Sequence, residues 1–231
     1  MREIVFDTET TGLSFSGGDR LVEIGCVEIV NRVETGRTFH AYFNPDRAMP
    51  AEAFAIHGLS DAFLSDKPRF AERVEDLLDF IGDAPLIAHN AGFDFGFVNG
   101  ELKQHGWPPV DLKRMVDTLT IARSKHPGAK HTLDALCSRY GIDRSHRVLH
   151  GALLDAQLLA QVYVELMGGR QIGLGLISEA ATADNAAPVR SQVASVVRPA
   201  RIFAASEDEL AAHAAFLERV KNPIWGSDAS A

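Results

Sequence analysis

The order in which strand-like and helix-like patterns follow one another constrains the fold of this chain most. Apolar runs at residues 3–8 and 20–30 are typical of buried strands, and a third run at 38–43 ends at Asn44-Pro45. Because short turns join these three runs, they predict an antiparallel meander. The first part of the chain is therefore expected to be a sheet built from consecutive strands.

After this meander, the apolar residues recur at the spacing of helices rather than strands. Asn90 is predicted to cap a helix over residues 91–105. A meander followed by alternating helices and strands predicts an α/β fold, in which helices flank a mixed sheet of antiparallel and parallel strands. The predicted helices span 70–81, 91–105, 132–140 and 151–167, and the predicted short strands span 85–89 and 115–118.

The chain has 231 residues, more than one typical domain of about 150 residues, so we expect one core with an appendage. The periodic patterns end near residue 170. A stretch rich in Ala, Ser, Asn and Val follows, and then Ser206 and Glu209 form a capping box that opens a short helix. We therefore interpret the chain as an α/β domain over 1–170, a linker over 171–205 and a flexible C-terminal tail over 206–231.

The composition excludes several classes of protein. Lys and Arg number 23 and Asp and Glu 31, so the formal net charge is −8 and no large basic field can hold duplex nucleic acid. The cysteines, Cys26 and Cys137, are too far apart for a disulfide framework or a zinc motif, which favours a reducing cytoplasm. No signal peptide and no membrane-spanning run is present, so we expect a cytoplasmic protein with no membrane partner.

Acidic residues stand at the ends of apolar elements. Asp7 and Glu9 are two residues apart at the end of the first strand, so both side chains point to the same side. Asp94 and Asp155 each lie near the start of a predicted helix, at the head of its apolar stripe. Each acid has a simpler interpretation, as a solvated strand end or as a favourable interaction with a helix dipole. His150, just before the last helix, would alone be interpreted as a surface or capping residue.

The joint occurrence of these acids favours a metal site. Three separate segments each bring acid to the end of an apolar element, and two divalent ions about 3.5 to 4 Å apart would balance four negative charges. Mg²⁺ or Mn²⁺ is expected, because no Cys or paired His offers a softer site.

Three segments resemble, in order, the three motifs of the DEDD exonuclease family that has histidine in its third motif: Val5–Leu13, His89–Asp94 and His150–Asp155. Segments 133–140 and 149–157 are similar in particular to the proofreading (epsilon) subunits of bacterial DNA polymerase III. The resemblance covers residues 2–170 closely and the tail more loosely.

This resemblance implies an RNase H-like fold and stepwise 3′→5′ hydrolysis of DNA to mononucleotides. It implies that His150 is the general base, and that two metal ions are held by Asp7, Glu9, Asp94 and Asp155. A single-stranded or frayed 3′ end as substrate agrees with the acidic net charge, because duplex tracking would demand phosphate neutralisation over many base pairs. The resemblance also places the terminal nucleotide near Thr10, Leu13, His57, Asn90 and Phe93, although His57 has the alternative of capping the loop at 58–60.

The segment after the domain offers two partner sites. Gln171, Leu174 and Leu176 fit the hexapeptide by which bacterial replication proteins bind the sliding clamp, although a simple turn at the domain end is an alternative. In the epsilon family the tail docks on the polymerase catalytic (alpha) subunit, with anchors here predicted as Phe203, Phe216 and Trp225. The alternative is a tail that folds back on the domain.

Two other functions remain open from the sequence. An exoribonuclease of the same superfamily would share every acidic residue and the histidine. A non-catalytic replisome adaptor would have no use for four grouped carboxylates, which argues against it.

Overall fold

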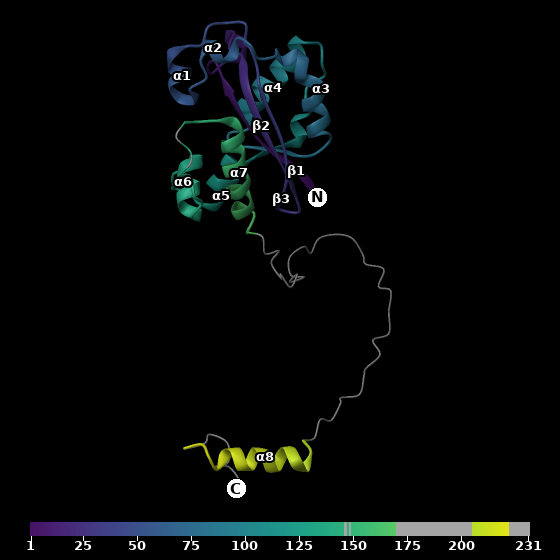
Figure 1. Ribbon diagram of the computed structural model, residues 1–231, viewed down its shortest axis with the longest axis vertical. Coiled ribbons are helices and arrows are strands. Elements are labelled where there is room, and N and C mark those ends of the chain that lie inside the picture. The colour runs from purple at the N-terminus through teal and green to yellow at the C-terminus, as the bar shows by residue number, and fades with distance from the viewer. Residues whose placement is uncertain (146, 148, 170–204, 222–231) are drawn as a thin grey trace, which may run out of the picture. The chain divides into compact units, whose positions relative to one another are not determined.

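The computed structural model describes residues 1–145, 147, 149–169 and 205–221 (Figure 1). The chain divides into two units, residues 1–177 and 178–231, and each is described by itself. The proposed clamp-binding residues Gln171, Leu174 and Leu176 lie outside the described residues, as do Phe203 and Trp225.

The first unit is built on a five-stranded mixed sheet with the strand order β3-β2-β1-β4-β5. The first three strands form the antiparallel meander predicted from the sequence, and β4 and β5 continue the sheet in parallel with β1. The predicted α/β fold with a mixed sheet is therefore confirmed. The strands are β1 (Arg2–Thr10), β2 (Leu21–Val30), β3 (Val33–Tyr42), β4 (Leu86–Ala88) and β5 (Met115–Asp117).

Strand β3 begins at Val33, well before the predicted start at residue 38. Asn31 and Arg32 have positive φ values of 51° and 67° and form a two-residue hairpin turn between β2 and β3. Arginine is not a usual residue for that conformation, and residues 33–38 are exposed. Neither turn chemistry nor apolar alternation therefore marks the beginning of this strand.

Two layers of helices cover the sheet, as Figure 1 shows. On one face, α3 and α4 pack against Ile4 and Phe6 of β1 in the larger core cluster. On the other face, α7 packs against Val5 of β1, and α5 and α6 pack against α7. The helices of this unit are α1 (Ala51–His57), α2 (Asp61–Leu64), α3 (Phe70–Ile81), α4 (Gly92–Gln104), α5 (Thr118–Lys125), α6 (Leu133–Tyr140) and α7 (Ala152–Leu166), with short 3₁₀ turns η1 (Phe15–Gly17) and η2 (Leu112–Arg114).

Helix α7 begins directly on top of strand β2. A Cβ atom at Gly25 of β2 would lie 2.2 Å from the backbone nitrogen of Leu153, so only glycine permits this approach. Gly25 is paired with Asp7 of β1 in the sheet. The absence of a side chain at Gly25 thus brings the first turn of α7, which carries Asp155, beside the acid-bearing part of β1.

The start of α4 differs from the prediction. Asn90 does not cap the helix: it has a positive φ of 64°, and Ala91 precedes the first helical residue without a side-chain cap. Asp117, at the end of β5, accepts hydrogen bonds from the backbone N–H groups of Asn90 at 3.0 Å and Ala91 at 3.3 Å. A carboxylate from the neighbouring strand therefore fixes this turn, which is a long-range contact that local spacing does not reveal.

The described part of the second unit contains helix α8 (Glu207–Leu217). Its predicted capping box is present, because Ser206 Oγ accepts from the Glu209 N–H at 3.3 Å and the Glu209 carboxylate accepts from the Ser206 N–H at 2.8 Å. None of the α8 residues is buried. Within the parts of the chain that the structure describes, no helix has the length and apolar character needed to cross a membrane.

Candidate active site

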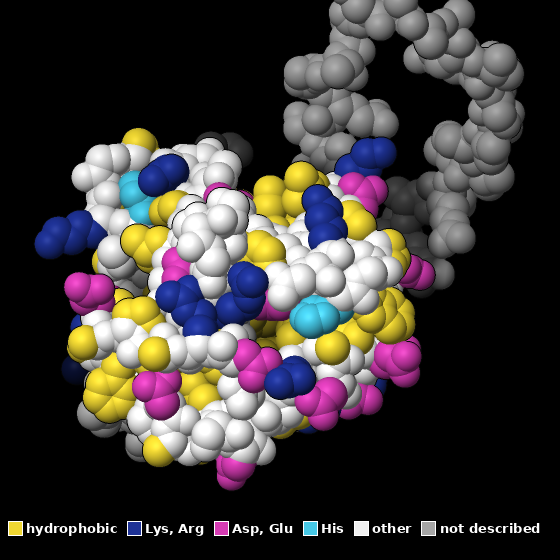
Figure 2. Space-filling model, turned by 90° about the horizontal axis from the view of Figure 1, so that it is seen from above, with side chains coloured by type: hydrophobic (Ala, Val, Ile, Leu, Met, Phe, Trp, Pro, Cys, Tyr) yellow, Lys and Arg dark blue, Asp and Glu magenta, His cyan; other side chains and the backbone are white. Residues whose placement is uncertain are grey.

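All five residues predicted for the metal and general-base roles line one cavity of about 530 Å³. The cavity opens where β1 and β4 end, and it is also lined by residues that immediately follow β4 and β5. Figure 2 looks onto this end of the first unit, where basic and acidic side chains lie close together around a hollow. The predicted residues are Asp7, Glu9, Asp94, His150 and Asp155.

The first three carboxylates come from β1 and α4. Asp7 is half-buried and Glu9 is buried, and both project from the last part of β1. Asp94 lies in the first turn of α4 and is only 3% exposed. Thr8, between the two acids of β1, donates a hydrogen bond from its hydroxyl to Asp94 at 2.7 Å, which ties α4 to the end of the strand.

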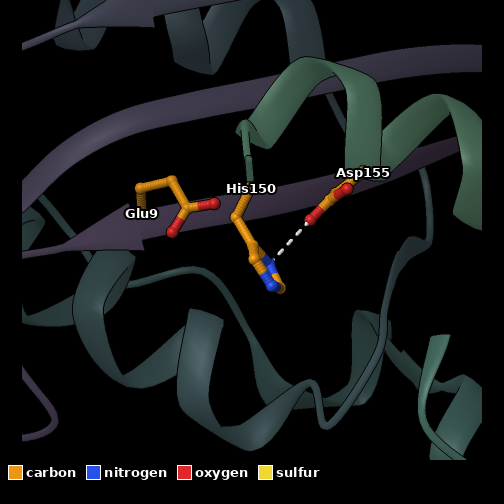
Figure 3. A group of neighbouring side chains, drawn as sticks. All are labelled: Glu9, His150 and Asp155. Carbon is orange, nitrogen blue, oxygen red and sulfur yellow. Dashed lines mark ion pairs between the residues drawn. The ribbon is translucent and has the colours of Figure 1, made fainter. Parts of the chain in front are cut away.

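The third segment brings an acid and a histidine to the same place. Asp155, in the first turn of α7, is 3% exposed, and Nδ1 of His150 lies 3.1 Å from its Oδ2. The backbone N–H of His150 donates to the carbonyl of Ile56 in α1 at 3.2 Å, which anchors this loop residue. Figure 3 shows the ring of His150 between the carboxylates of Glu9 and Asp155. One possible ligand atom from each of these three side chains lies within 4.8 Å of the other two.

Burial and mutual repulsion make this arrangement of acids unfavourable without a cation. Burial, with the charges of Asp94 and Glu9, holds the pKa of Asp7 well above its usual range. Burial raises the pKa of Glu9 to about 8, with a further contribution from Glu23, which lies opposite it in β2. Burial also raises the pKa of Asp94 to about 7. A divalent cation among these oxygens would favour their ionised forms.

The donor set fits hard divalent metal ions. Four carboxylates supply oxygen ligands, which Mg²⁺ and Mn²⁺ prefer, and the two cysteines are buried elsewhere, in core clusters. The raised pKa values are an independent sign of the same fit, because like charges gathered in a partly buried cavity are stabilised when a cation lies between them.

One residue at the centre of the site was missed by the sequence analysis. Arg147 lines the cavity, and its guanidinium donates to both carboxylate oxygens of Asp155. It also donates to Asp134 at 2.7 Å and to Nδ1 of His150 at 2.8 Å. Arg147 lies in a loop with no periodic pattern, so its position eight residues before Asp155 carries no signal that it reaches the acids.

The predicted substrate-binding residues are only partly brought together. Asn90 and Phe93 line the cavity, whereas Thr10, Leu13 and His57 are not among its lining residues. Thr10 is buried and its hydroxyl donates to the carbonyl of Gly12 at 2.6 Å, and Leu13 is 86% exposed. The cavity is also lined by His89, Arg123 and His131, which the sequence analysis did not select.

His57 occupies an unusual position at the end of α1. Its side chain is buried, and Nδ1 accepts from the backbone N–H of Leu59 at 3.1 Å, which is the loop contact expected as the alternative role. Its Nε2 is buried and has no hydrogen-bond partner within the described residues. Burial lowers the pKa of His57, so the ring is held in its neutral form.

Among the predicted partner-binding residues, Phe216 alone falls within the described ranges. It lies on α8 and is 58% exposed, and Leu210 on the same helix is 57% exposed.

A mixed sheet of this order, with carboxylates and a histidine gathered where β1 ends, defines the class of RNase H-like metal-dependent exonucleases. The chain belongs to the Exonuclease family RNase_T, which it matches over residues 4–163. It also belongs with the DNA polymerase III epsilon subunits. It is 49% identical to "DNA polymerase III subunit epsilon" of Rickettsia conorii over 228 residues, covering 95% of this chain and 96% of the relative.

Other comparisons agree. The chain is 45% identical to "DNA polymerase III subunit epsilon" of Escherichia coli strain K12 over 230 residues, covering 95% of this chain and 93% of the relative. Among solved structures, exonuclease X in complex with 5′ overhanging duplex DNA is 26% identical with a TM-score of 0.56, over 71% of this chain and 90% of that chain.

The nuclease domain of 3′hExo, a DEDDh family member bound to rAMP, has a TM-score of 0.63 over 72% of this chain and 92% of that chain. At 15% identity it supports the fold alone. The predicted RNase H-like fold and the family resemblance are therefore confirmed. The predicted activity, that of a proofreading 3′→5′ exonuclease, is confirmed with them.

Proposed function

We propose that this exonuclease removes mispaired 3′-terminal nucleotides from DNA by two-metal hydrolysis at the cavity described above. Asp7, Glu9, Asp94 and Asp155 would hold the two ions, and His150 would be the general base. The observation that carries the proposal is that these five side chains, from three distant segments, line one cavity. Two ions, Mg²⁺ or Mn²⁺, would supply charge to the attacking and the leaving oxygen of the phosphodiester.

The chain's own residues supply the remaining chemistry. His150 is about half exposed and projects into the cavity, so its ring can accept a proton from a water molecule beside the terminal phosphate. Imidazole is suited to this transfer because its charge changes near neutral pH. The carboxylate of Asp155 and the backbone contact to Ile56 set the position of the ring.

The terminal nucleotide would lie against Phe93 and Asn90, which line the cavity. An aromatic ring provides a stacking surface for any base, so the site would not select one sequence. His57 does not line the cavity, so its place in this proposal rests on the family resemblance alone. Thr10 and the exposed Leu13, at and just after the end of β1, would complete this subsite.

The partner proposals rest on the relatives and on α8. The relatives are named as subunits of DNA polymerase III, so we propose that the tail at 206–231 binds the polymerase catalytic (alpha) subunit, with Phe216 as an exposed anchor. Gln171, Leu174 and Leu176 would bind the sliding clamp. The exonuclease domain at 1–170, the linker at 171–205 and the tail belong to the same proposal, as does a cytoplasmic location.

The test compares two substitutions in the purified protein with single-stranded DNA and Mg²⁺. Asp7→Asn is expected to abolish degradation, because it removes one of the four carboxylates that would hold the ions. His150→Gln is expected to slow degradation by about 10²-fold or more, while Mn²⁺ binding measured by calorimetry is retained. Asp79→Asn, at an exposed position on α3, is the matched control and is expected to leave the rate unchanged.

Normal turnover in Asp7→Asn would reject the metal assignment. Loss of Mn²⁺ binding in His150→Gln would make the histidine a ligand rather than a base. Matched DNA and RNA oligonucleotides with free 3′ ends test the substrate, and the names of the relatives favour DNA.

A further inference from the structure

The guanidinium of Arg147 lies among the carboxylates of the cavity. Its side chain is only 9% exposed, and it donates from Nε and Nη2 to the two oxygens of Asp155, the latter at 2.7 Å. This is the two-point geometry in which arginine binds carboxylates most strongly. Arg147 therefore neutralises the charge of Asp155, the buried acid of the third segment.

These contacts use the same atoms that a metal ion would use. Asp155 has two carboxylate oxygens, and both accept from Arg147. A divalent ion coordinated by either oxygen would compete for the same electron pairs and would lie within repulsive distance of the guanidinium charge. Arg147 and a metal ion at Asp155 are therefore expected to exclude one another.

The structure also holds an alternative partner for the arginine. Nη1 of Arg147 donates to Asp134 at 2.7 Å, and Asp134 lies in the first turn of α6 with its side chain 47% exposed. Arg144 contacts the same carboxylate at 2.9 Å. Asp134 can therefore keep hold of the guanidinium after Asp155 has released it.

We propose that Arg147 is a resident counter-cation of the acid cluster, which metal ions displace from Asp155 when they bind. The inference rests on the proposed metal site at Asp155. It makes the metal affinity of the protein a difference between two competing interactions, rather than a property of the carboxylates alone.

The displacement also affects His150. Nη2 of Arg147 lies 2.8 Å from Nδ1 of the histidine, and the same nitrogen lies 3.1 Å from Oδ2 of Asp155, so the arginine and the carboxylate both contact this atom of the ring. Release of Arg147 by an incoming metal ion would therefore also remove its contact to the histidine ring.

The test measures Mn²⁺ binding to the full-length chain by isothermal titration calorimetry. Arg147→Ala is expected to bind Mn²⁺ about tenfold more tightly than the unsubstituted protein, equivalent to about 1.4 kcal/mol. Arg147→Lys, which keeps the charge without the two-point geometry, is expected to fall between them. Arg144→Ala is the matched control: it removes a contact to the same Asp134 from a more exposed side chain, and is expected to leave the affinity unchanged.

The direction of the change in Mn²⁺ affinity in Arg147→Ala distinguishes displacement of the arginine from a positioning role. If Arg147 instead remained bound and positioned Asp155 for the metal, Arg147→Ala would bind Mn²⁺ more weakly, and that result or an unchanged affinity would overturn the inference. If Asp155→Asn bound Mn²⁺ as tightly as the unsubstituted protein, the metal site itself would be wrong and both proposals would be rejected. Tight binding that is lost in Asp155→Asn but unaffected by Arg147→Ala would reject the inference alone.

A second measurement needs no destabilising substitution. In the unsubstituted protein, the Nε–H resonance of Arg147, identified by its loss in Arg147→Lys, reports the contact to Asp155. Titration with Mg²⁺ is expected to shift this resonance and to speed its exchange with water. A resonance that stays unchanged at saturating Mg²⁺ would show that the arginine is not displaced, and would overturn the inference even if Arg147→Ala failed to fold.

Discussion

At the scale of the residue, the site is defined by acids that are costly to ionise together. Burial raises the pKa of Glu9 to about 8 and that of Asp94 to about 7, and the pKa of Asp7 is also raised. Arg147 lowers the pKa of Glu9 by its charge but does not compensate the whole cluster. The carboxylates are therefore placed for cation binding at the expense of stability.

This placement predicts a pH dependence of stability in the presence of a chelator. Below the usual carboxyl pKa of about 4.5 the acids are protonated in both states. Between that pH and about 8, the folded protein keeps protons on Glu9 that the unfolded chain has lost, so the free energy of unfolding falls as pH rises. We expect the melting temperature in EDTA to decrease steadily from about pH 5 to about pH 9.

Saturating Mg²⁺ is expected to remove most of this decrease, because the bound ions stabilise the ionised carboxylates. Glu9→Gln is expected to weaken the dependence in EDTA, and Asp79→Asn, at an exposed position on α3, to leave it unchanged. Differential scanning fluorimetry with and without EDTA measures both. A melting temperature in EDTA that is flat or rises over this range would contradict the raised pKa values.

At this scale, the sequence analysis predicted the acidic residues of the site but not Arg147, the basic side chain that contacts them. Strand alternation was enough to put Asp7 and Glu9 on one side, and helical spacing placed Asp155 at the head of a buried stripe. Arg147 could not be predicted, since a loop has no period from which the direction of a side chain follows. Asn90 was predicted as a helix cap for its residue type, but α4 has no side-chain cap, and the turn before it is held by Asp117, which is distant in sequence.

At the scale of the element, the position of α7 decides whether the third segment reaches the other two. Hydrophobic spacing predicted this helix and its buried face, because apolar residues dominate its contact with the sheet. Its height above the sheet depends instead on Gly25 in β2, where a Cβ atom would meet the backbone of α7. A glycine inside a strand signals a close approach, yet its partner can only be identified in the folded structure.

Gly25→Ala is therefore expected to damage the site without touching any of its residues. The added methyl group would lie 2.2 to 2.4 Å from the backbone of residues 152 and 153, so α7 must move away from β2 and carry Asp155 with it. We expect a loss of stability of about 1–3 kcal/mol from overpacking, together with a fall in nuclease rate of about tenfold or more, because catalysis is sensitive to misplacement of about 1 Å.

The matched control is Gly96→Ala on α4, where nothing lies within 4 Å of the added Cβ. Alanine at a helical position is expected to stabilise the protein by about 0.5–1 kcal/mol and to leave the rate unchanged. Urea unfolding and single-stranded DNA degradation measure the two effects. Full activity in Gly25→Ala would show that the close approach of α7 to Gly25 in β2 does not position Asp155.

At the scale of the whole molecule, the change from strand to helix period was sufficient to predict the mixed sheet. It could not predict α1, α2 or α5, which are short and lie between longer elements.

The second unit differs from the first because its described helix buries no residue. Helix α8 is well capped, yet none of its residues is buried, and Leu210 and Phe216 are more than half exposed. A helix of 11 residues gains little stability from its own hydrogen bonds in water, so an apolar binding partner would stabilise it.

This leads to a prediction that separates the two units. Deletion of residues 206–231 is expected to leave the degradation rate of free single-stranded DNA unchanged, because every cavity-lining residue lies at or before Asp155. The same deletion is expected to abolish co-purification with the polymerase catalytic subunit.

Within the full chain, Phe216→Ala is expected to weaken the association with the polymerase subunit by about 2 kcal/mol or more, as loss of an aromatic anchor does. His213→Ala, on the same exposed helix, is the control and should have little effect. Binding measured by surface plasmon resonance on immobilised polymerase subunit distinguishes these variants, and retention of full affinity after the deletion would place the contact on the exonuclease domain instead.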